Sequence, residues 1–315
     1  MQSASIRPLA NMLPRKLFNA EHEAFRETVR KFYEKEVVPN IAKYEEQQHV
    51  DRDLWNKAGE MGLLCATMPE EYGGYGVDRL YSMILIEEQA YAMDSSTGFS
   101  LHSDIVANYV NNFGNEEQKK HWIPKMVSGE VVTAIAMTEP GTGSDLQGVR
   151  TTAVLDGDEY VINGSKIFIT NGYLCDMAIV VCKTGSTDKG SANLSLIIVE
   201  ANRAGFSKGK PLNKIGMKGQ DTCELFFEDV RVPKENLLGM EGMGFIMLMK
   251  ELAWERMLVA IICQAGSEVA FAHTVQYTKD RKAFRDRFQP CLFRPLYGIA
   301  TRRYFRYRSS CSSKI

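Results

Sequence analysis

The chain has 315 residues, of which 44% are hydrophobic, and a formal net charge of −1, which is typical of a globular protein with two or three domains. Residues 285–315 carry eight Lys or Arg and one acidic residue, a net charge of +7, so residues 1–284 carry a net charge of −8. This acidic balance excludes a broad basic surface for nucleic acid on residues 1–284. No uninterrupted apolar run reaches the roughly eighteen residues of a membrane-spanning helix, and we expect none. The seven cysteines form no C-x-x-C pair and the five histidines are scattered, which favours reduced thiols and argues against a metal site.

The first part of the chain shows apolar residues at helical spacing and predicts an all-helical domain over residues 17–128. Asn19 is the expected N-cap of the first helix, and Asn115 with Gln118 has the spacing of a capping pair for the last one. Between them, we expect residues 95–113 to form one mostly apolar, buried helix.

Residues 130–238 change to the period of β-strands and predict a β domain, either a small barrel or a sandwich. Asp156-Gly157 is typical of a hairpin turn between two short strands. Asn163-Gly164 is expected to be the turn of another strand pair. A helical domain followed by a β domain predicts an α+β fold.

Residues 239–284 begin a third domain, whose main element is an apolar helix expected over 245–280. A helix of this length needs antiparallel neighbours to cover its apolar surface. The basic, Ser-rich tail 285–315 has no helical periodicity, so we expect the C-terminal helical bundle to be incomplete. A shifted reading frame after Phe284 and a real basic tail both remain open.

The most distinctive local segment, AIAMTEPGTGSD at 134–145, is a strand followed by a glycine-rich turn. The missing Cβ atoms of Gly141 and Gly143 let a ligand approach the backbone after the Pro140 turn. The segment also carries three hydroxyls, on Thr138, Thr142 and Ser144. Such a strand edge suits a flat, polar ligand. It lacks the Lys-Ser/Thr pair of a P-loop and the third glycine of the dinucleotide fingerprint, and a plain structural turn is the alternative.

Glu255 lies in the expected helix 245–280 and is the candidate general base. Three apolar residues share its predicted face: Leu252, Val259 and Ile262. A carboxylate on such a face is desolvated, which raises its pKa and suits it to accept a proton. Like-charge repulsion from Glu251, one turn earlier, acts in the same direction. The alternative is a structural Glu255 at the helix edge, paired with Arg256 or a lysine.

Five segments, taken in this order, resemble the acyl-CoA dehydrogenase family, the flavoenzymes of fatty-acid β-oxidation. They are residues 134–145, 160–172, 214–233, 251–260 and 279–284. The resemblance covers nearly the whole chain from Leu17 to Phe284. Within it, the Met217–Thr222 segment and Glu255 are most similar to the long-chain acyl-CoA dehydrogenases.

The resemblance implies an FAD-dependent dehydrogenation of a long-chain acyl-CoA to its trans-2-enoyl-CoA. Glu255 would remove the α-proton, and flavin N5 would accept a hydride from the β-carbon. The resemblance places eight residues at the FAD of the same subunit: Ile135, Met137, Thr138, Gly143, Ser144, Phe168, Ile169 and Thr170. It places two more, Arg281 and Phe284, at the FAD of a neighbouring subunit. Those that it places at the substrate are Ser144, Ser191, Ile246, Trp254 and Arg256.

The resemblance also implies a homotetramer that passes electrons to an electron-transfer flavoprotein. It would work in the mitochondrial matrix of a eukaryote or in the cytoplasm of a bacterium. Residues 1–16 are weakly basic and lack acids, which leaves open a short mitochondrial targeting piece or a true start at Met12. In the family, the segment after Phe284 continues through a helical bundle that closes the active site and builds the oligomer, and residues 285–315 depart from it.

Two other functions stay open. Without that bundle, the chain could be an inactive remnant whose exposed apolar helix binds partners. The arginines of 285–315 interleave with aromatic residues, which is the pattern of a nucleic-acid or membrane arm.

Overall fold

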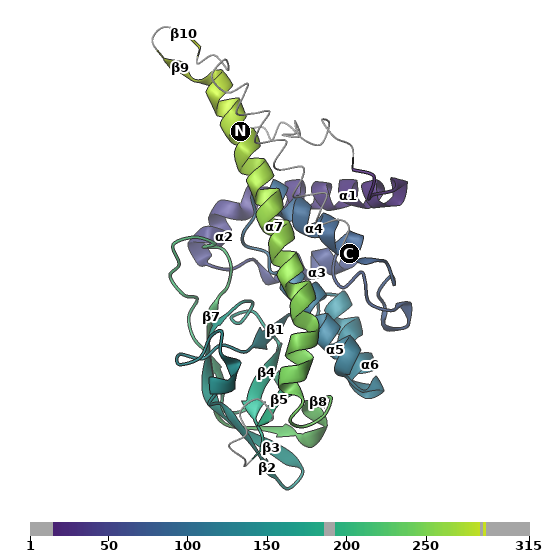
Figure 1. Cartoon of the computed structure of the whole chain (residues 1–315), viewed down its shortest axis with the longest axis vertical. Helices are drawn as coiled ribbons and strands as arrows, with labels where there is room; N and C mark the ends of the chain where they lie inside the picture. The colour runs from purple at the N-terminus through teal and green to yellow at the C-terminus, as the bar shows by residue number, and fades with distance from the viewer. Residues whose placement is uncertain (1–14, 186–192, 284–285, 288–315) are drawn as a thin grey trace.

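The computed structural model describes residues 15–185, 193–283 and 286–287. The chain runs first through a layer of helices, then through a mixed β-sheet, and last into one long helix that extends past both (Figure 1). This order confirms the expected α+β class.

The helical layer contains α1 (Ala20–Phe32), α2 (Ile41–Gln47), α3 (Arg52–Glu60), α4 (Arg79–Tyr91), α5 (Ala107–Phe113) and α6 (Glu116–Val127). Both predicted N-caps are confirmed. Asn19 Oδ1 accepts from the His22 N–H at 2.9 Å, and Asn115 Oδ1 accepts from the Gln118 N–H at 2.8 Å. In each case the side chain of the third helical residue bonds back to the N-cap backbone and closes a capping box.

The helix expected over residues 95–113 begins later than predicted. Asp94 accepts hydrogen bonds from the N–H groups of Ser96 at 2.8 Å and Thr97 at 3.1 Å, which holds this stretch as a tight loop. A π-helical turn over Leu101–Val106 then leads into α5. The local side-chain bonds of Asp94 compete with helix formation here.

The β domain is one eight-stranded sheet with the order β6-β7-β3-β2-β4-β5-β8, and β1 pairs in parallel with β4. Its strands are β1 (Thr133–Ala136), β2 (Thr152–Asp156), β3 (Glu159–Ile169), β4 (Met177–Lys183), β5 (Leu194–Glu200), β6 (Phe206–Lys208), β7 (Cys223–Pro233) and β8 (Leu237–Leu238). The hairpin predicted at Asp156-Gly157 is confirmed, since β2 and β3 pair in antiparallel fashion around it. A separate pair, β9 (Lys282–Ala283) and β10 (Asp286–Arg287), follows the long helix.

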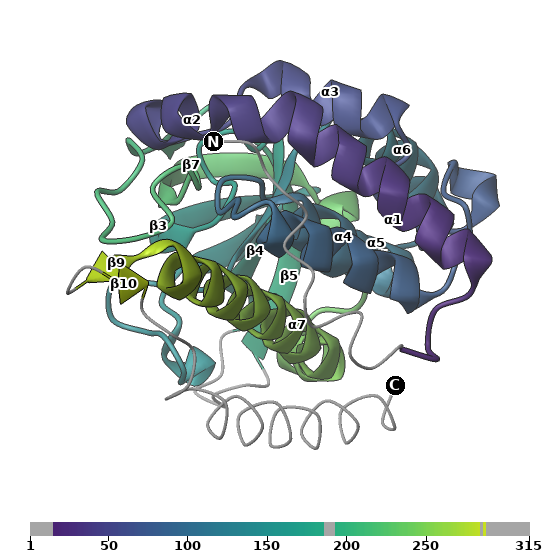
Figure 2. The ribbon, with the colours of Figure 1, turned by 90° about the horizontal axis from the view of Figure 1, so that it is seen from above.

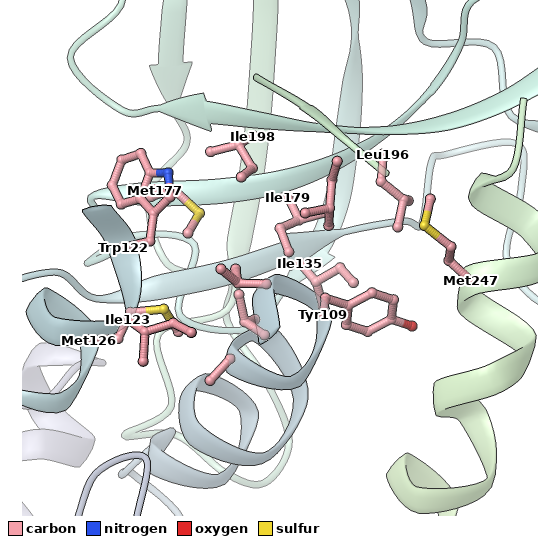
Figure 3. Packing of buried hydrophobic residues seen from close by; sticks show 14 of the residues in the cluster. Tyr109, Trp122, Ile123, Met126, Ile135, Met177, Ile179, Leu196, Ile198 and Met247 are labelled. Atoms are coloured by element: carbon pink, nitrogen blue, oxygen red, sulfur yellow. The ribbon is translucent and has the colours of Figure 1, made fainter. Parts of the chain in front are cut away.

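The central strands β4 and β5 are buried on both faces. Ile179 of β4 packs in a cluster with residues of α5 and α6 (Figure 3). Its neighbour Val180 belongs to a second cluster, with Ile162 of β3 and Phe227 of β7. Because strand side chains alternate between faces, β3 and β7 must curl over the face of β4 that the helices leave free. The sheet therefore packs on itself like a sandwich, one of the two expected architectures.

The turn predicted at Asn163-Gly164 is wrong, because β3 runs unbroken through both residues. Gly164 lies at an irregularity in the pairing with β7 and has a φ of 152°. A Cβ there would lie 2.4 Å from Thr151 Oγ1, so the glycine serves a close approach between strands. The Asn163 side chain exchanges two hydrogen bonds of 2.9 Å with Asp229.

The long helix α7 (Gly244–Asp280) confirms the helix expected over 245–280. It lies beside α4 (Figure 2), where Trp254 and Ile261 pack with Ile86. Among the described residues, α7 is the one helix long and apolar enough to cross a bilayer, and 33% of its most apolar stretch is buried within the protein. The expectation of no such helix considered only uninterrupted apolar runs, whereas α7 reaches a mean hydropathy of 1.4 across charged residues.

Candidate active site

The carboxylate of Glu255 accepts a hydrogen bond from Tyr109 of α5. Tyr109 Oη donates to Glu255 Oε1 at 2.8 Å, and in Figure 3 this hydroxyl points toward α7. Tyr109 is 0% exposed, so the surrounding core fixes the place of its hydroxyl, whereas Glu255 is half-buried. A buried phenol that donates to a half-buried carboxylate fixes its orientation and stabilises its charged form.

A second carboxylate, Glu251, lies one turn before Glu255 and has its own partner on α5. Asn112 Nδ2 donates to Glu251 Oε1 at 2.9 Å, and Glu251 is 7% exposed. The two glutamates are four residues apart on α7, and Tyr109 and Asn112 are three apart on α5, so each pair follows one helix face. Two polar contacts therefore join α5 to α7.

Burial raises the pKa of Glu255, the hydrogen bond from Tyr109 acts to lower it, and the charge of Glu251 raises it further. The upward direction is the one expected from the sequence, but the expected cause is wrong in part. Val259, one of the apolar residues expected to desolvate Glu255, is itself 61% exposed. The contact with Tyr109 of α5, which the sequence did not indicate, contributes to the burial.

The substrate candidates on α7 differ in their exposure. Ile246 is 46% exposed, whereas Trp254 is 7% exposed. The guanidinium carbon of Arg79 lies 4.4 Å from the centroid of the Trp254 ring, so contacts within the protein account for the position of this tryptophan. Arg256 is exposed, and no ion pair joins it to Glu255, although both residues belong to the described part of the chain.

The strand edge after β1 is held against β3. The Ile167 N–H donates to the Thr138 carbonyl at 2.9 Å, and Lys166 Nζ donates to the Met137 carbonyl at 3.0 Å. The Lys166 side chain is 0% exposed, and its second partner is the Glu139 carboxylate at 2.9 Å. A buried ammonium group with two oxygen partners fixes residues 137–139 in one conformation.

Glu139 collects further hydrogen bonds from the other end of the turn. Its carboxylate accepts from the N–H groups of Arg150 at 2.6 Å and Thr151 at 2.9 Å, in addition to Lys166. Burial acts to raise the pKa of Glu139, but the bonds from Thr151 and the charge of Lys166 outweigh it and lower the pKa. Glu139 is therefore a charged residue that ties both ends of the turn to β3.

The glycine-rich turn is confirmed by backbone hydrogen bonds of 2.9 and 3.0 Å between Glu139 and Thr142. A Cβ added at Gly141 or Gly143 would meet no atom within 4 Å, so packing within the chain does not require glycine at either position. Ser144 is exposed beside them. This part of the turn has the open space that close approach of a ligand to the backbone requires.

An exposed aromatic residue in an unusual conformation lies near the end of β3. Phe168 is 63% exposed and has a φ of 60°, a backbone strain that proteins retain mainly at functional sites. Ile169 is 3% exposed and packs in the sheet core, so only its backbone is available to a ligand. Thr170 is half-buried.

Asn171 anchors this strand end from the other side. It is 0% exposed, and its Nδ2 donates to the carbonyls of Gly98 at 3.1 Å and Thr133 at 3.2 Å. Gln220 Nε2 donates to Asn171 Oδ1 at 3.2 Å. The backbone of Phe168 is thus held between the β3 contacts described above and a fully bonded asparagine.

One hydrophobic cluster joins the strand edge to the candidate base. Ile135 and Met137 belong to the cluster that contains Tyr109 and Met247, and Figure 3 shows Ile135 beside Tyr109, with Met247 on the α7 side. Because Tyr109 also donates to Glu255, a single buried residue touches both parts of the candidate site.

The structure does not bring Arg281 to this strand edge. Arg281 directly follows α7 and lies about 39 Å along the helix direction from Glu255, at roughly 1.5 Å per residue, and Figure 1 shows this end of α7 far from β1. Arg281 is exposed, and its Nη1 donates to Tyr277 Oη at 3.0 Å. Ser191 and Phe284 lie outside the described residues.

Sequence reasoning missed the residues that hold the site in place, namely Tyr109, Asn112, Glu139, Lys166 and Asn171. Tyr109 and Asn112 are three residues apart and the two α7 glutamates are four apart, so each pair can share a helix face, but the sequence does not indicate that these two faces meet. Lys166 and Glu139 carry no local signal, since their partnership depends on how β3 meets the turn.

Three family models match the chain in order. They are acyl-CoA dehydrogenase, N-terminal domain, at residues 19–130; acyl-CoA dehydrogenase, middle domain, at residues 134–230; and acyl-CoA dehydrogenase, C-terminal domain, at residues 242–289. These matches cover the helical layer, most of the sheet and α7.

Individual relatives agree with this result. The mitochondrial long-chain specific acyl-CoA dehydrogenase of Sus scrofa is 51% identical over 285 residues, which are 90% of this chain and 66% of the relative. The crystal structure of acyl-CoA dehydrogenase from Geobacillus kaustophilus is similar with a TM-score of 0.88 and 46% identity, over 91% of this chain and 76% of that chain. The acyl-CoA dehydrogenase complexed with FAD from Bacillus anthracis has a TM-score of 0.79 and 37% identity, over 86% and 47% of the two chains. The chain belongs to the acyl-CoA dehydrogenase family.

Proposed function

We propose that the chain is an FAD-dependent dehydrogenase that converts a long-chain acyl-CoA to its trans-2-enoyl-CoA, with Glu255 as the base. The observation that supports this most is the single cluster in which Tyr109, the hydrogen-bond partner of Glu255, packs with Ile135 and Met137 of the strand edge. The family membership and the FAD complex of the Bacillus anthracis relative support the same reading.

The residues of the strand edge fit a flavin. Uncrowded glycines, the exposed hydroxyl of Ser144, the half-buried Thr138 and a large exposed aromatic side chain occur together around the turn after β1. Such a set suits a flat aromatic ring system with a polar, phosphate-bearing tail. When bound, FAD supplies the acceptor for the hydride that leaves the β-carbon.

Each residue has a proposed part in holding FAD. Phe168 stacks on the ring system, Met137 and Thr138 border it, and Thr138, Ser144 and Thr170 donate hydrogen bonds. Gly143 allows close approach to the backbone, and Ile135 and Ile169, whose side chains are buried, contribute backbone groups. Lys166, Glu139 and Asn171 keep these groups in place.

Glu255 accepts the α-proton of the thioester in this proposal. That proton is weakly acidic, so a carboxylate with an ordinary pKa is a poor base for it. The raised pKa of Glu255, caused first by its burial, moves the group toward the required basicity. Its half-buried position also leaves one side open to a substrate.

The substrate would extend along both parts of the site. The exposed Ser144 suits contact with the polar CoA portion, a role that we also assign to Ser191, and the exposed guanidinium of Arg256 suits the same portion. Ile246, 46% exposed on the turns of α7 before Glu255, is the candidate contact for the acyl chain. Trp254 is buried against α4, so in this proposal it supports the exposed substrate contacts of α7 by packing behind them.

The position of Arg281 supports an oligomer. At about 39 Å along the helix direction from Glu255, its guanidinium suits contact with the FAD of a neighbouring subunit, and we propose a homotetramer. We further propose an electron-transfer flavoprotein as the electron acceptor. The compartment would be the mitochondrial matrix, which agrees with the word mitochondrial in the name of the Sus scrofa relative, or the cytoplasm of a bacterium.

The test is an anaerobic titration of the purified chain, first with FAD and then with palmitoyl-CoA and, separately, butyryl-CoA. We expect FAD to remain bound through gel filtration and to lose its visible absorbance with palmitoyl-CoA, with formation of the trans-2-enoyl-CoA. Bound FAD that neither acyl-CoA reduces would refute the activity. Faster reduction by butyryl-CoA would refute only the long-chain preference.

A second candidate function, that of a flavin-free interaction protein, is favoured by the exposed apolar side chains along α7. Four of the large apolar side chains of α7 are more than one third exposed: Ile246 (46%), Met249 (41%), Val259 (61%) and Tyr277 (59%). Exposed apolar surface of this kind is typical of contact sites. A chain that purifies without flavin and does not take up added FAD would favour this candidate over the enzyme.

A further inference from the structure

We propose that Tyr109 and Glu251 are positioning residues that act on Glu255 in opposite directions. Tyr109 orients the Glu255 carboxylate and stabilises its charged form, and Glu251, held in place by Asn112, destabilises that form. The inference depends on the proposed function of Glu255 as the base.

Core packing around the Tyr109 ring fixes the position of its hydroxyl. Its ring lies in the core cluster at 0% exposure, between Ile135 and Met247 (Figure 3). The ring edge also meets Phe113, with centroids 5.9 Å apart. The 2.8 Å hydrogen bond to Glu255 Oε1 is therefore a bond from a fixed donor to a longer, more mobile side chain. Such a donor selects one rotamer of the carboxylate and leaves Oε2 available to accept a proton.

Glu251 is held near the same carboxylate. It lies four residues earlier on α7, a spacing that brings Cβ atoms to about 6 Å. The 2.9 Å bond from Asn112 prevents it from turning away, and at 7% exposure it has little solvent to screen its charge. A carboxylate charge held this close opposes the ionisation of Glu255, so Glu251 makes Glu255 a stronger base.

The other titratable and charged groups on α7 and on the elements packed against it are engaged elsewhere or exposed. On α7 and the elements packed against it, these groups include Arg79, Glu87 and Glu88 on α4, Asp104 on the π-helical turn, Glu200 on β5, and Lys250 and Arg256 on α7. Glu87 pairs with Arg26 and Glu88 with Arg30. Arg79 stacks on Trp254, Asp104 accepts from Ser82, and Glu200 pairs with Arg203. Lys250 and Arg256 are exposed to solvent. Within the described part of the chain, the groups that act on the Glu255 charge are Tyr109 and Glu251.

The two positioning residues predict shifts of opposite sign. Tyr109→Phe removes a donor to the charged form, so the pKa of Glu255 rises and the acid limb of the rate profile moves to higher pH, by about one to two units. Glu251→Gln removes the opposing charge, so the limb moves to lower pH, by about one unit. The double variant is expected to lie between the single variants.

The experiment measures the first-order rate of flavin reduction by saturating palmitoyl-CoA from pH 5 to 9 in the FAD-loaded chain and its variants. A second readout follows the ¹³C resonance of the Glu255 carboxyl during a pH titration, assigned by its loss in Glu255→Gln. The control is Tyr160→Phe, which removes a comparable phenol–carboxylate bond, to Glu241 at 3.1 Å, on the sheet. The control is expected to keep the parental profile.

Opposite shifts of the limb and of the carboxyl titration support the inference. Shifts of the same sign, or shifts below about 0.3 unit in both variants, would overturn it, because a purely structural effect on the α5–α7 contact has no reason to depend on charge. If palmitoyl-CoA fails to reduce the flavin of the parent chain, the proposed function fails. The ¹³C titration still decides the relation between Tyr109, Glu251 and Glu255 in that case.

Discussion

Replacing Lys166 by Met is the sharpest test of how the strand edge is held. The substitution keeps most of the length and apolar volume of the side chain but removes the ammonium group. Glu139 then stays buried without its cation, and the Met137 carbonyl loses its 3.0 Å donor.

The expected loss of stability follows from the contacts. Removing one partner of a buried ion pair typically costs about 3–5 kcal/mol, because the remaining charge is left uncompensated. Glu139 keeps its bonds from the Arg150 and Thr151 N–H groups, so we expect the lower end, about 3 kcal/mol of unfolding free energy. The double variant Lys166→Met/Glu139→Gln also removes the unpaired charge of Glu139 and is expected to recover part of this loss. Burial lowers the pKa of Lys166, which shows that the charged pair is itself costly to bury, so replacing both partners costs less than replacing one.

The assay is equilibrium unfolding in urea, combined with a measurement of FAD affinity by fluorescence titration. The control is Lys234→Met, which breaks an exposed pair with Asp158 and is expected to leave the unfolding midpoint unchanged. A Lys166→Met protein as stable as the control would refute the reasoning. A double variant less stable than the single variant would show that the pair does not act through the stranded charge.

The remaining predictions concern a buried carboxyl group and the flavin face. Burial raises the pKa of Asp104 to about 7, so between pH 4 and 7 the folded protein keeps a proton that the unfolded chain releases. The contribution of Asp104 to the free energy of unfolding therefore falls by about 4 kcal/mol as the pH rises from about 4 to 7. At pH 8, Asp104→Asn should therefore unfold at a higher urea concentration than the parent. Its unfolding free energy should also fall less between pH 5 and 8, and a fall equal to that of the parent would contradict this. Phe168→Ala should weaken FAD binding by roughly 2- to 10-fold through lost stacking but leave the urea midpoint of the FAD-free chain unchanged, because this side chain is 63% exposed; an equal FAD affinity would remove Phe168 from the flavin site.

The parts of the fold that the sequence predicted well depend on local signals. The caps at Asn19 and Asn115 and the turn at Asp156-Gly157 each need only a few neighbouring residues, and all three are confirmed. The predicted helix over 245–280 differs from α7 by one residue at its start, since a long apolar stretch without Pro has few alternatives.

The parts that failed depend on contacts between distant segments. Asn163-Gly164 has the sequence of a hairpin turn, but pairing with β7 keeps β3 extended through it. The pair of Tyr109 and Glu255 joins residues 146 positions apart, and no periodicity within either helix indicates that these two faces meet. For the same reason the raised pKa of Glu255 was predicted in the right direction but with an exposed residue, Val259, among its causes.

Sequence pattern alone left the role of Glu255 open between a base and a structural residue at a helix edge. The structural alternative paired Glu255 with Arg256 or a lysine. Among the residues that the structure describes, Glu255 forms no such ion pair, and its hydrogen-bond partner is the buried Tyr109. The structure also separates the proposed flavin contacts into exposed and buried side chains. Exposed groups such as Phe168 and Ser144 are available to a ligand, whereas the side chain of Ile169 belongs to the sheet core.

The most direct measurement is the anaerobic rate of flavin reduction by palmitoyl-CoA in Glu255→Gln, with Glu228→Gln, an exposed site on β7, as the matched control. The amide introduced by Glu255→Gln keeps an oxygen that can accept from Tyr109, so the fold and bound FAD should be retained while the proton acceptor is lost. We expect the rate to fall by about 10²- to 10⁴-fold in Glu255→Gln and to stay at the parental value in the control. A Glu255→Gln protein that holds FAD and reduces it at the parental rate would contradict the assignment of Glu255 as the base.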